Sequence, residues 1–215
     1  MAKHFNTAGP CKANIHYMLS PTARLPELKA LIDGENYFII HAPRQVGKTT
    51  AMIALAQELT DSGEYIAVML SLEVGAPFSR DPGMAERAIL DEWQESACVY
   101  LPTNLHPPRW PPSQPGRQIG AALASWAKVA TRPLVVFLDE IDALADETLI
   151  SVLRQLRSGY NRRPSFPHSV GLIGMRMCGT MVKSREERLN TSSPFNIKAE
   201  SLTLNNFTLS EVEEL

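Results

Sequence analysis

Residues 37–50 constrain the fold of this 215-residue chain more than any other stretch. Residues 37–40 are apolar and predict a short strand, which leads into a tight loop and then into Gly-Lys-Thr at 47–49. A strand, a loop ending in Gly-Lys-Thr and the start of a helix follow one another in the phosphate-binding P-loop, whose template is G-x-x-x-x-G-K-[ST]. Ala42 stands where the template has its first glycine. The alternative is therefore an ordinary strand–turn–helix with an accidental Gly-Lys-Thr.

Each position of this loop has a chemical reason to contact a nucleotide. Free backbone N–H groups at a helix N-terminus favour negative charge, so residues 44–50 are expected to cradle phosphates. Gly47 lets the backbone approach a phosphate without a Cβ, Lys48 can reach the outer phosphates, and the Thr49 hydroxyl can hold Mg²⁺. Arg44 can instead project toward solvent or a partner subunit. The predicted nucleotide-binding residues of the loop are Pro43, Arg44, Gln45, Val46, Gly47, Lys48, Thr49 and Thr50.

A second motif follows the apolar run 134–138, which predicts a buried strand that continues directly into Asp139 and Glu140. Ligands of parallel α/β sheets bind outside the carboxyl ends of the strands, so this Walker B pattern and the P-loop can face one crevice. Asp139 is expected to orient Mg²⁺ through a bound water, and Glu140 to polarise an attacking water. The alternative for Glu140 is a carboxylate that only favours a helix N-terminus. Asp142 is interpreted first as the N-cap of the next helix, and second as a contact to Mg²⁺ or to a phosphate sensor.

Apolar strands alternate with helical stripes along the chain, which predicts an α/β fold with a parallel sheet. The expected strands are 37–41, 65–72, 134–138, 169–175 and, with weaker alternation, 197–204. The expected helices are 26–32, 48–61, 82–99, 117–130 and 143–160. Six prolines between 102 and 115 predict a stiff surface connection rather than a docking segment for an aromatic groove.

Composition and the termini limit the class of protein. A hydrophobic content of 44% and a charged content of 20% are typical of a soluble globular chain, and a net charge of −2 argues against a generally basic nucleic-acid binder. Residues 1–7 lack the apolar core of a signal peptide, and no apolar run approaches the roughly 18 residues that span a bilayer. The three cysteines lie far apart and predict reduced thiols rather than a disulfide or zinc site. A cytoplasmic protein without membrane contact is expected.

Positive charge gathers in one part of the chain. The segment 154–198 contains nine Lys or Arg and two Asp or Glu, so it can form a patch for phosphates, nucleic acid or an acidic partner. A solvated helix face and loop is the favoured interpretation. Either Arg162 or Arg163 can serve as an arginine finger for a neighbouring subunit. The other arginines considered for the patch are Arg154, Arg157, Arg185 and Arg188.

Arg176 lies just past the fourth expected strand. In P-loop folds this strand lies between the first and third, so its end faces the γ-phosphate and Arg176 can sense that group. A solvated loop arginine is the alternative. At the C-terminal end, capping boxes at Thr208 and Ser210 open a helix, yet the chain ends at Leu215 about one turn later. A truncated chain is expected.

The motifs and their order resemble the bacterial and archaeal AAA-like ATPases, near the archaeal-ATPase and STAND groups of P-loop ATPases. The matching stretches are 5–11, 16–18, 41–50, 138–142 and 193–197. Such proteins commonly carry Ala-Pro-Arg-Gln before Gly-Lys-Thr, as this chain does from Ala42. Where the family often continues with an Asp-containing segment, Met177-Cys178-Gly179 follows Arg176 here.

The resemblance implies a P-loop NTPase fold: a three-layer α/β/α sandwich with a mainly parallel five-stranded sheet in the order 5-1-4-3-2. It implies that Tyr17 lies against the adenine of ATP. It also implies three regions: an N-terminal lead-in near the nucleotide at 1–36, an ATPase core at 37–207, and the start of a truncated helical lid at 208–215.

The leading hypothesis is an ATPase core that uses ATP and Mg²⁺, with Lys48, Glu140 and Arg176 as catalytic residues and with Thr49 and Asp139 as metal ligands. Two alternatives stay open. One is a non-catalytic, nucleotide-gated scaffold or switch that acts through a protein partner or self-association. The other is a nucleic-acid-associated ATPase that uses the 154–198 patch.

Overall fold

The computed structural model describes residues 3–6, 11, 14–18, 25–41, 43, 46–174, 198–204, 206 and 208. Helices and strands alternate along most of this length. The helices are α1 (Glu27–Asp33), α2 (Lys48–Asp61), α3 (Pro82–Tyr100), α4 (Gln118–Val129) and α5 (Asp146–Tyr160). The strands are β1 (Tyr37–His41), β2 (Ile66–Ser71), β3 (Leu134–Asp139), β4 (Ser169–Gly174) and β5 (Lys198–Thr203). Short 3₁₀ turns are η2 (Glu73–Phe78), η3 (Thr103–Leu105) and η4 (Ile141–Ala143).

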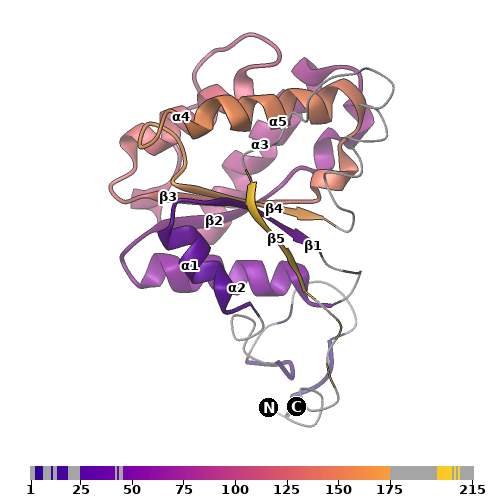
Figure 1. Cartoon of the computed structure of the whole chain (residues 1–215), viewed down its shortest axis with the longest axis vertical. Coiled ribbons are helices and arrows are strands. Elements are labelled where there is room, and N and C mark those ends of the chain that lie inside the picture. The colour runs from indigo at the N-terminus through magenta and orange to yellow at the C-terminus, as the bar shows by residue number, and fades with distance from the viewer. Residues whose placement is uncertain are drawn as a thin grey trace.

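The five strands form one parallel sheet in the order β2-β3-β4-β1-β5, which confirms the predicted order and fold class. Helices α1 and α2 cover one face of the sheet, and α3, α4 and α5 cover the other (Figure 1). The strands also end together, because His41 of β1 pairs with Gly174 of β4 and Ser71 of β2 pairs with Asp139 of β3. The chain therefore leaves β1 and β3 at the same edge of the sheet.

Two apolar cores, one on each face of the sheet, hold these layers together. Every residue of β3 and of β4 is buried, as expected for parallel strands that are covered on both faces. Trp93 of α3 and Trp126 of α4 are fully buried in the larger core, on the side of α3–α5. Both tryptophans are thus core residues. Within the described part of the chain, no helix is both long enough and apolar enough to cross a membrane.

The starts of α3 and α5 differ in how they are capped. Asp81 caps α3, because its carboxylate accepts a hydrogen bond of 3.0 Å from the backbone N–H of Met84. The prediction that Asp142 caps the following helix is wrong. That helix, α5, begins only at Asp146 after Ala145, and Asp142 lies in the preceding 3₁₀ turn. Two extended residues, Leu144 with ψ of 142° and Ala145 with ψ of 169°, separate this turn from the start of α5.

A buried carboxylate in α3 fastens the helical layer, and no sequence pattern pointed to it. Glu86 is fully buried. Its Oε2 accepts hydrogen bonds from the backbone N–H groups of Gly116, at 3.0 Å, and Gln118, at 3.2 Å. Its Oε1 accepts from Gln155 Nε2 at 2.5 Å and from Ser151 Oγ at 3.2 Å. This one side chain therefore joins α3, the start of α4 and α5.

Replacing Glu86 by alanine is expected to lower the free energy of unfolding by about 3 kcal/mol, because buried donors lose their charged acceptor. Urea denaturation followed by circular dichroism measures this loss. Asp91→Ala is the matched control, since Asp91 lies on the exposed side of the same helix and should change stability by less than about 0.5 kcal/mol. Equal losses in the two variants would contradict the fastening role of Glu86.

Candidate functional site

The loop after β1 leads into α2 through a glycine in a conformation that other residues rarely adopt. Gly47 is the N-cap of α2 with φ of 83° and ψ of 17°, in the left-handed region that lacks steric cost only for glycine. Lys48 and Thr49 form the first positions of the helix. Of the other predicted loop residues, Pro43 and the buried Val46 are described, whereas Ala42, Arg44 and Gln45 lie outside the described residues.

The start of α2 meets the end of β3. The Thr49 hydroxyl donates a hydrogen bond of 3.0 Å to Oδ2 of Asp139, about ninety residues further along the chain. The Lys48 ammonium lies 3.6 Å from Oδ1 of Asp139 and 3.5 Å from Oε1 of Glu140. The structure therefore brings together the four side chains that carried the sequence argument.

Both charges at the centre of this group are buried. Lys48 is 8% exposed and Asp139 is 3% exposed, and charges at such depth persist only when they are paired and hydrogen-bonded. Asp139 meets that condition, because its Oδ1 also accepts a 2.9 Å hydrogen bond from the backbone N–H of Glu140. The carboxylate is thus held on both oxygens by groups from α2 and from its own turn.

Glu140 differs from Asp139 in backbone and in exposure. A φ of 56° is uncommon for a residue with a side chain, and strain of this kind concentrates at functional sites. Its side chain is 37% exposed, so it lies at the mouth of the site rather than inside it. Burial is the main cause that raises the pKa of the Glu140 carboxyl; Asp139 and Asp142 raise it further, and Lys48 opposes them. A carboxylate with a raised pKa is a better proton acceptor near neutral pH.

Asp142 lies against the end of β4 rather than at a helix cap. A Cβ built on Gly174, the last residue of β4, would lie 2.8 Å from Oδ1 of Asp142. A glycine at this position therefore lets the carboxyl pack against the strand end. Arg176, the predicted phosphate sensor two residues further on, lies outside the described residues.

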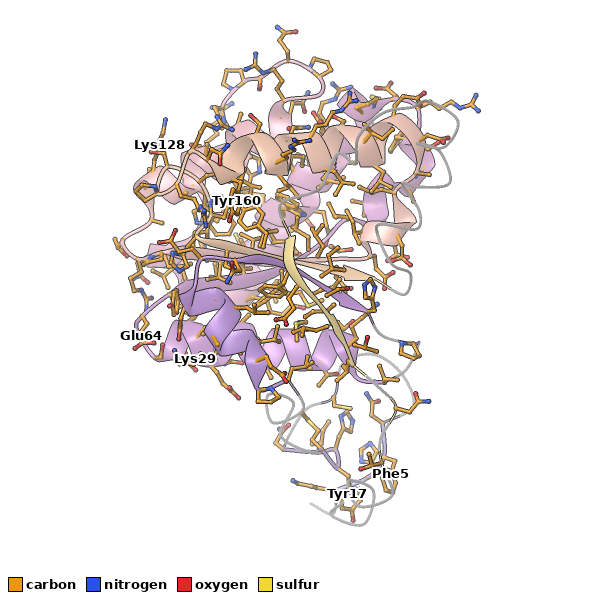
Figure 2. All side chains as sticks on the ribbon, in the orientation of Figure 1. Phe5, Tyr17, Lys29, Glu64, Lys128 and Tyr160 are labelled. Carbon is orange, nitrogen blue, oxygen red and sulfur yellow. The ribbon has the colours of Figure 1, made fainter. Side chains whose placement is uncertain are left out.

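Part of the N-terminal lead-in contacts the same helix. The backbone N–H of Cys11 donates a 3.1 Å hydrogen bond to Oγ1 of Thr50, in the first turn of α2. Tyr17 is 38% exposed, and its ring centroid lies 5.0 Å from that of Phe5. Figure 2 shows these two rings together at the end of the molecule that lies beyond α2. The expected contact of Tyr17 with adenine stays a prediction.

The donor atoms at this edge suit magnesium. Mg²⁺ binds oxygen ligands, keeps several waters and takes only one or two protein side chains when a phosphate substrate supplies the rest. The hydroxyl of Thr49 and the carboxylate of Asp139 are two such oxygens, and they lie 3.0 Å apart. Among the residues that the structure describes, no group of three or more His, Cys, Asp or Glu side chains could hold a metal.

Comparisons with known proteins bear on the fold. Neither protein-family models nor curated proteins give a match. Among solved structures, this chain is similar to a Walker-type ATPase of Pyrococcus abyssi, with a TM-score of 0.64 and 12% sequence identity. The chain has a P-loop NTPase fold. The alignment covers 97% of this chain and 59% of the other, so the chain spans less than two thirds of that protein.

The P-loop glycine gives a prediction with an internal control. Gly47 and Gly63 share a left-handed backbone, with φ of 83° and 82°, so Gly47→Ala and Gly63→Ala should each cost about 1 kcal/mol of unfolding free energy. A Cβ at Gly63 would meet only Arg132 Nη1, at 3.9 Å. Isothermal titration with ATP should show weaker binding for Gly47→Ala alone. Equal ATP affinity in the two variants would show that the Gly47 backbone does not contact the phosphates.

Proposed function

We propose that this chain is the core of an Mg²⁺-dependent ATPase that binds ATP between residues 43–50 and the Asp139-Glu140 pair. The observation that carries the proposal is the 3.0 Å hydrogen bond from the Thr49 hydroxyl to Asp139, with the Lys48 ammonium within 3.6 Å of both acids. It joins a phosphate-binding loop to a metal-binding carboxylate. The Pyrococcus abyssi protein of similar fold is described as a Walker-type ATPase, which supports the same activity here.

Binding of the phosphates rests on α2 and on Lys48. The N-terminus of α2 favours negative charge, and Gly47 allows close approach of the backbone. Lys48 now neutralises two carboxylates, of which Glu140 is the more exposed. The outer phosphates of ATP carry more negative charge than that carboxylate. The ammonium therefore turns to the phosphates when ATP binds, and this turn releases Glu140.

Thr49 and Asp139 would hold Mg²⁺, which neutralises charge on the phosphates when it is bound. For this purpose the Thr49 hydroxyl must turn its proton away from Asp139, so that both oxygens present lone pairs. The hydrogen bond from the Glu140 N–H to Asp139 does not have to break for this, so it can hold the carboxylate in place.

Hydrolysis rests on Glu140. The released carboxylate accepts a proton from a water molecule whose oxygen attacks the γ-phosphorus, while the bond from this phosphorus to the ADP oxygen breaks. Burial raises the pKa of Glu140, which increases its basicity as a proton acceptor. We further propose that Arg176 contacts the γ-phosphate, that Tyr17 contacts the adenine, and that residues 208–215 open a helical lid as the AAA-like resemblance implies.

A nucleotide-gated switch without turnover is the second candidate. The 3.5 Å ion pair between Lys48 and Glu140 favours it, because a carboxylate that remains paired with this lysine is a poor base. The two candidates share the binding site and differ only in whether Glu140 is released when ATP binds.

Two variants separate binding from turnover. Lys48→Ala should abolish ATP binding, because it removes the cation that faces the outer phosphates. Glu140→Gln should keep ATP affinity and lower kcat by about 10²- to 10⁴-fold, the usual contribution of a general base. Isothermal titration with ATP, ADP and GTP, with and without Mg²⁺, followed by a phosphate-release assay on the same samples, measures both effects.

Glu147→Gln is the matched control, since Glu147 is an exposed glutamate in the first turn of α5 and should not alter kcat. Wild-type turnover in Glu140→Gln would refute the base assignment. Binding of ATP without phosphate release in the wild-type chain would select the switch instead.

A further inference from the structure

A cavity in the helical layer is lined by residues of the proline-rich connection, α4 and α5. These helices lie on the face of the sheet opposite α2 (Figure 1). The cavity lies between the end of the proline-rich connection, the start of α4 and the second half of α5, and its volume is about 650 Å³. Small-molecule sites measure roughly 300–1,000 Å³, so the cavity has the size of a ligand pocket rather than of a crevice between side chains. None of the predicted nucleotide-binding residues lines it.

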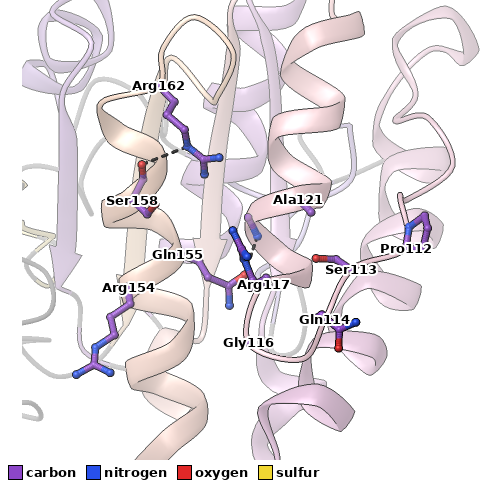
Figure 3. A pocket seen from close by; sticks show the side chains of 11 residues that line it. Pro112, Ser113, Gln114, Gly116, Arg117, Ala121, Arg154, Gln155, Ser158 and Arg162 are labelled. Atoms are coloured by element: carbon purple, nitrogen blue, oxygen red, sulfur yellow. Dashed lines mark hydrogen bonds between the residues drawn. The ribbon is translucent and has the colours of Figure 1, made fainter.

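The lining of this cavity is positively charged. It includes Arg117, Arg154 and Arg162, and no Asp or Glu is among the described residues that line it. Figure 3 shows the side chains of Arg117 and Arg162 in the space between α4 and α5, whereas Arg154 points to the other side of α5. Two guanidinium groups, one from the N-cap of α4 and one from the turn after α5, therefore face one space.

These two guanidinium groups are available for a ligand. The Nε of Arg162 donates a 3.3 Å hydrogen bond to the carbonyl of Ser158, and the group lies 5.3 Å from the Phe166 ring centroid. Both contacts fix the orientation of Arg162 and leave its two terminal amino groups for other acceptors. Among the described residues, no carboxylate lies within 4.0 Å of Arg117 or of Arg162, as ion pairing would require.

The buried carboxylate beneath the cavity does not serve as that acceptor. Glu86 is fully buried, and its two oxygens already accept four hydrogen bonds from α4, α5 and the preceding turn. The backbone N–H of Gly120 in α4 is likewise taken, by Oε1 of Gln155 at 2.8 Å. The polar groups that remain for a ligand are thus side chains, above all the two arginines, with Ser113, Gln114 and Ser158 at the wall.

We propose that this cavity binds the phosphate group of a small phosphorylated molecule through Arg117 and Arg162. The planar fork of a guanidinium matches a phosphate in a bidentate way, and the forks of Arg117 and Arg162 can share its three or four oxygens. A small molecule fits better than a nucleic acid, because the positive groups line a concave site of limited volume in a chain whose net charge is −2. The site is independent of the proposed ATPase centre.

Pyrophosphate is the probe, and it is titrated calorimetrically into the full-length Lys48→Ala variant so that the P-loop does not contribute. The Lys48→Ala variant is expected to bind pyrophosphate. Adding either Arg117→Gln or Arg162→Gln to this variant should lower the affinity for pyrophosphate about tenfold, the effect of losing a charge-assisted hydrogen bond. Arg109→Gln, an exposed arginine of the proline-rich connection outside the cavity, is the matched control and should leave the affinity unchanged.

Absence of pyrophosphate binding to Lys48→Ala at millimolar concentration would overturn the proposal, as would equal affinity in Arg117→Gln and Arg109→Gln. Malonate, titrated in parallel, should bind more weakly, and tighter malonate binding would overturn the assignment to phosphate. A single-stranded oligonucleotide is titrated as well. If it binds through both arginines and pyrophosphate does not bind, the ligand of the cavity is a nucleic acid and the proposal of a small molecule is wrong. Circular dichroism of each variant distinguishes a lost ligand from a lost fold.

Discussion

The arrangement of this site depends on the burial of the Asp139 carboxylate. An ionised group that is 3% exposed is stable only with partners, and Asp139 finds them in the Thr49 hydroxyl, the Glu140 N–H and the Lys48 ammonium. These partners come from two elements that are far apart in sequence. The parallel sheet supplies the proximity, because β1 and β3 flank β4 and end at the same edge. The fold and the electrostatics of the site are therefore parts of one arrangement.

The buried carboxylates of Asp139 and Glu86 differ in the kind of partners that hold them. Both are buried, but the hydrogen-bonding partners of Glu86 are neutral backbone and side-chain groups that hold α4 in place. Those groups cannot turn to a ligand without leaving the carboxylate unsatisfied. The partners of Asp139 include a mobile ammonium and a hydroxyl that can rotate, and both can turn to a ligand while the Glu140 N–H stays. Exchangeable partners make the strand edge suitable for binding, and fixed partners make the helical layer rigid.

The features that followed from the sequence are those with a local cause. Apolar runs gave the strands, and the Gly-Lys-Thr and Asp-Glu motifs marked two strand ends that the sheet brings together. The cap of α5 was missed because Leu144 and Ala145 are extended and delay the helix to Asp146, which no pattern around Asp142 encodes. Glu86 and Arg117 were missed for another reason, and the sequence named Arg162 without placing it beside Arg117. Each meets its neighbours only through the packing of α3, α4 and α5, and a single arginine or glutamate on a helix gives no periodic signal.

The charges at the strand edge also account for a dependence on magnesium under the proposed activity. Without nucleotide, one ammonium faces the carboxylates of Asp139 and Glu140, and Asp142 lies close enough to raise the pKa of Glu140. The described side chains at this edge therefore carry more negative than positive charge, which disfavours the triphosphate without a metal. A divalent cation that accompanies the phosphates reverses that balance, since Asp139 and Thr49 then face positive charge. Under the proposed activity, the carboxylates that disfavour free ATP would favour its complex with the metal.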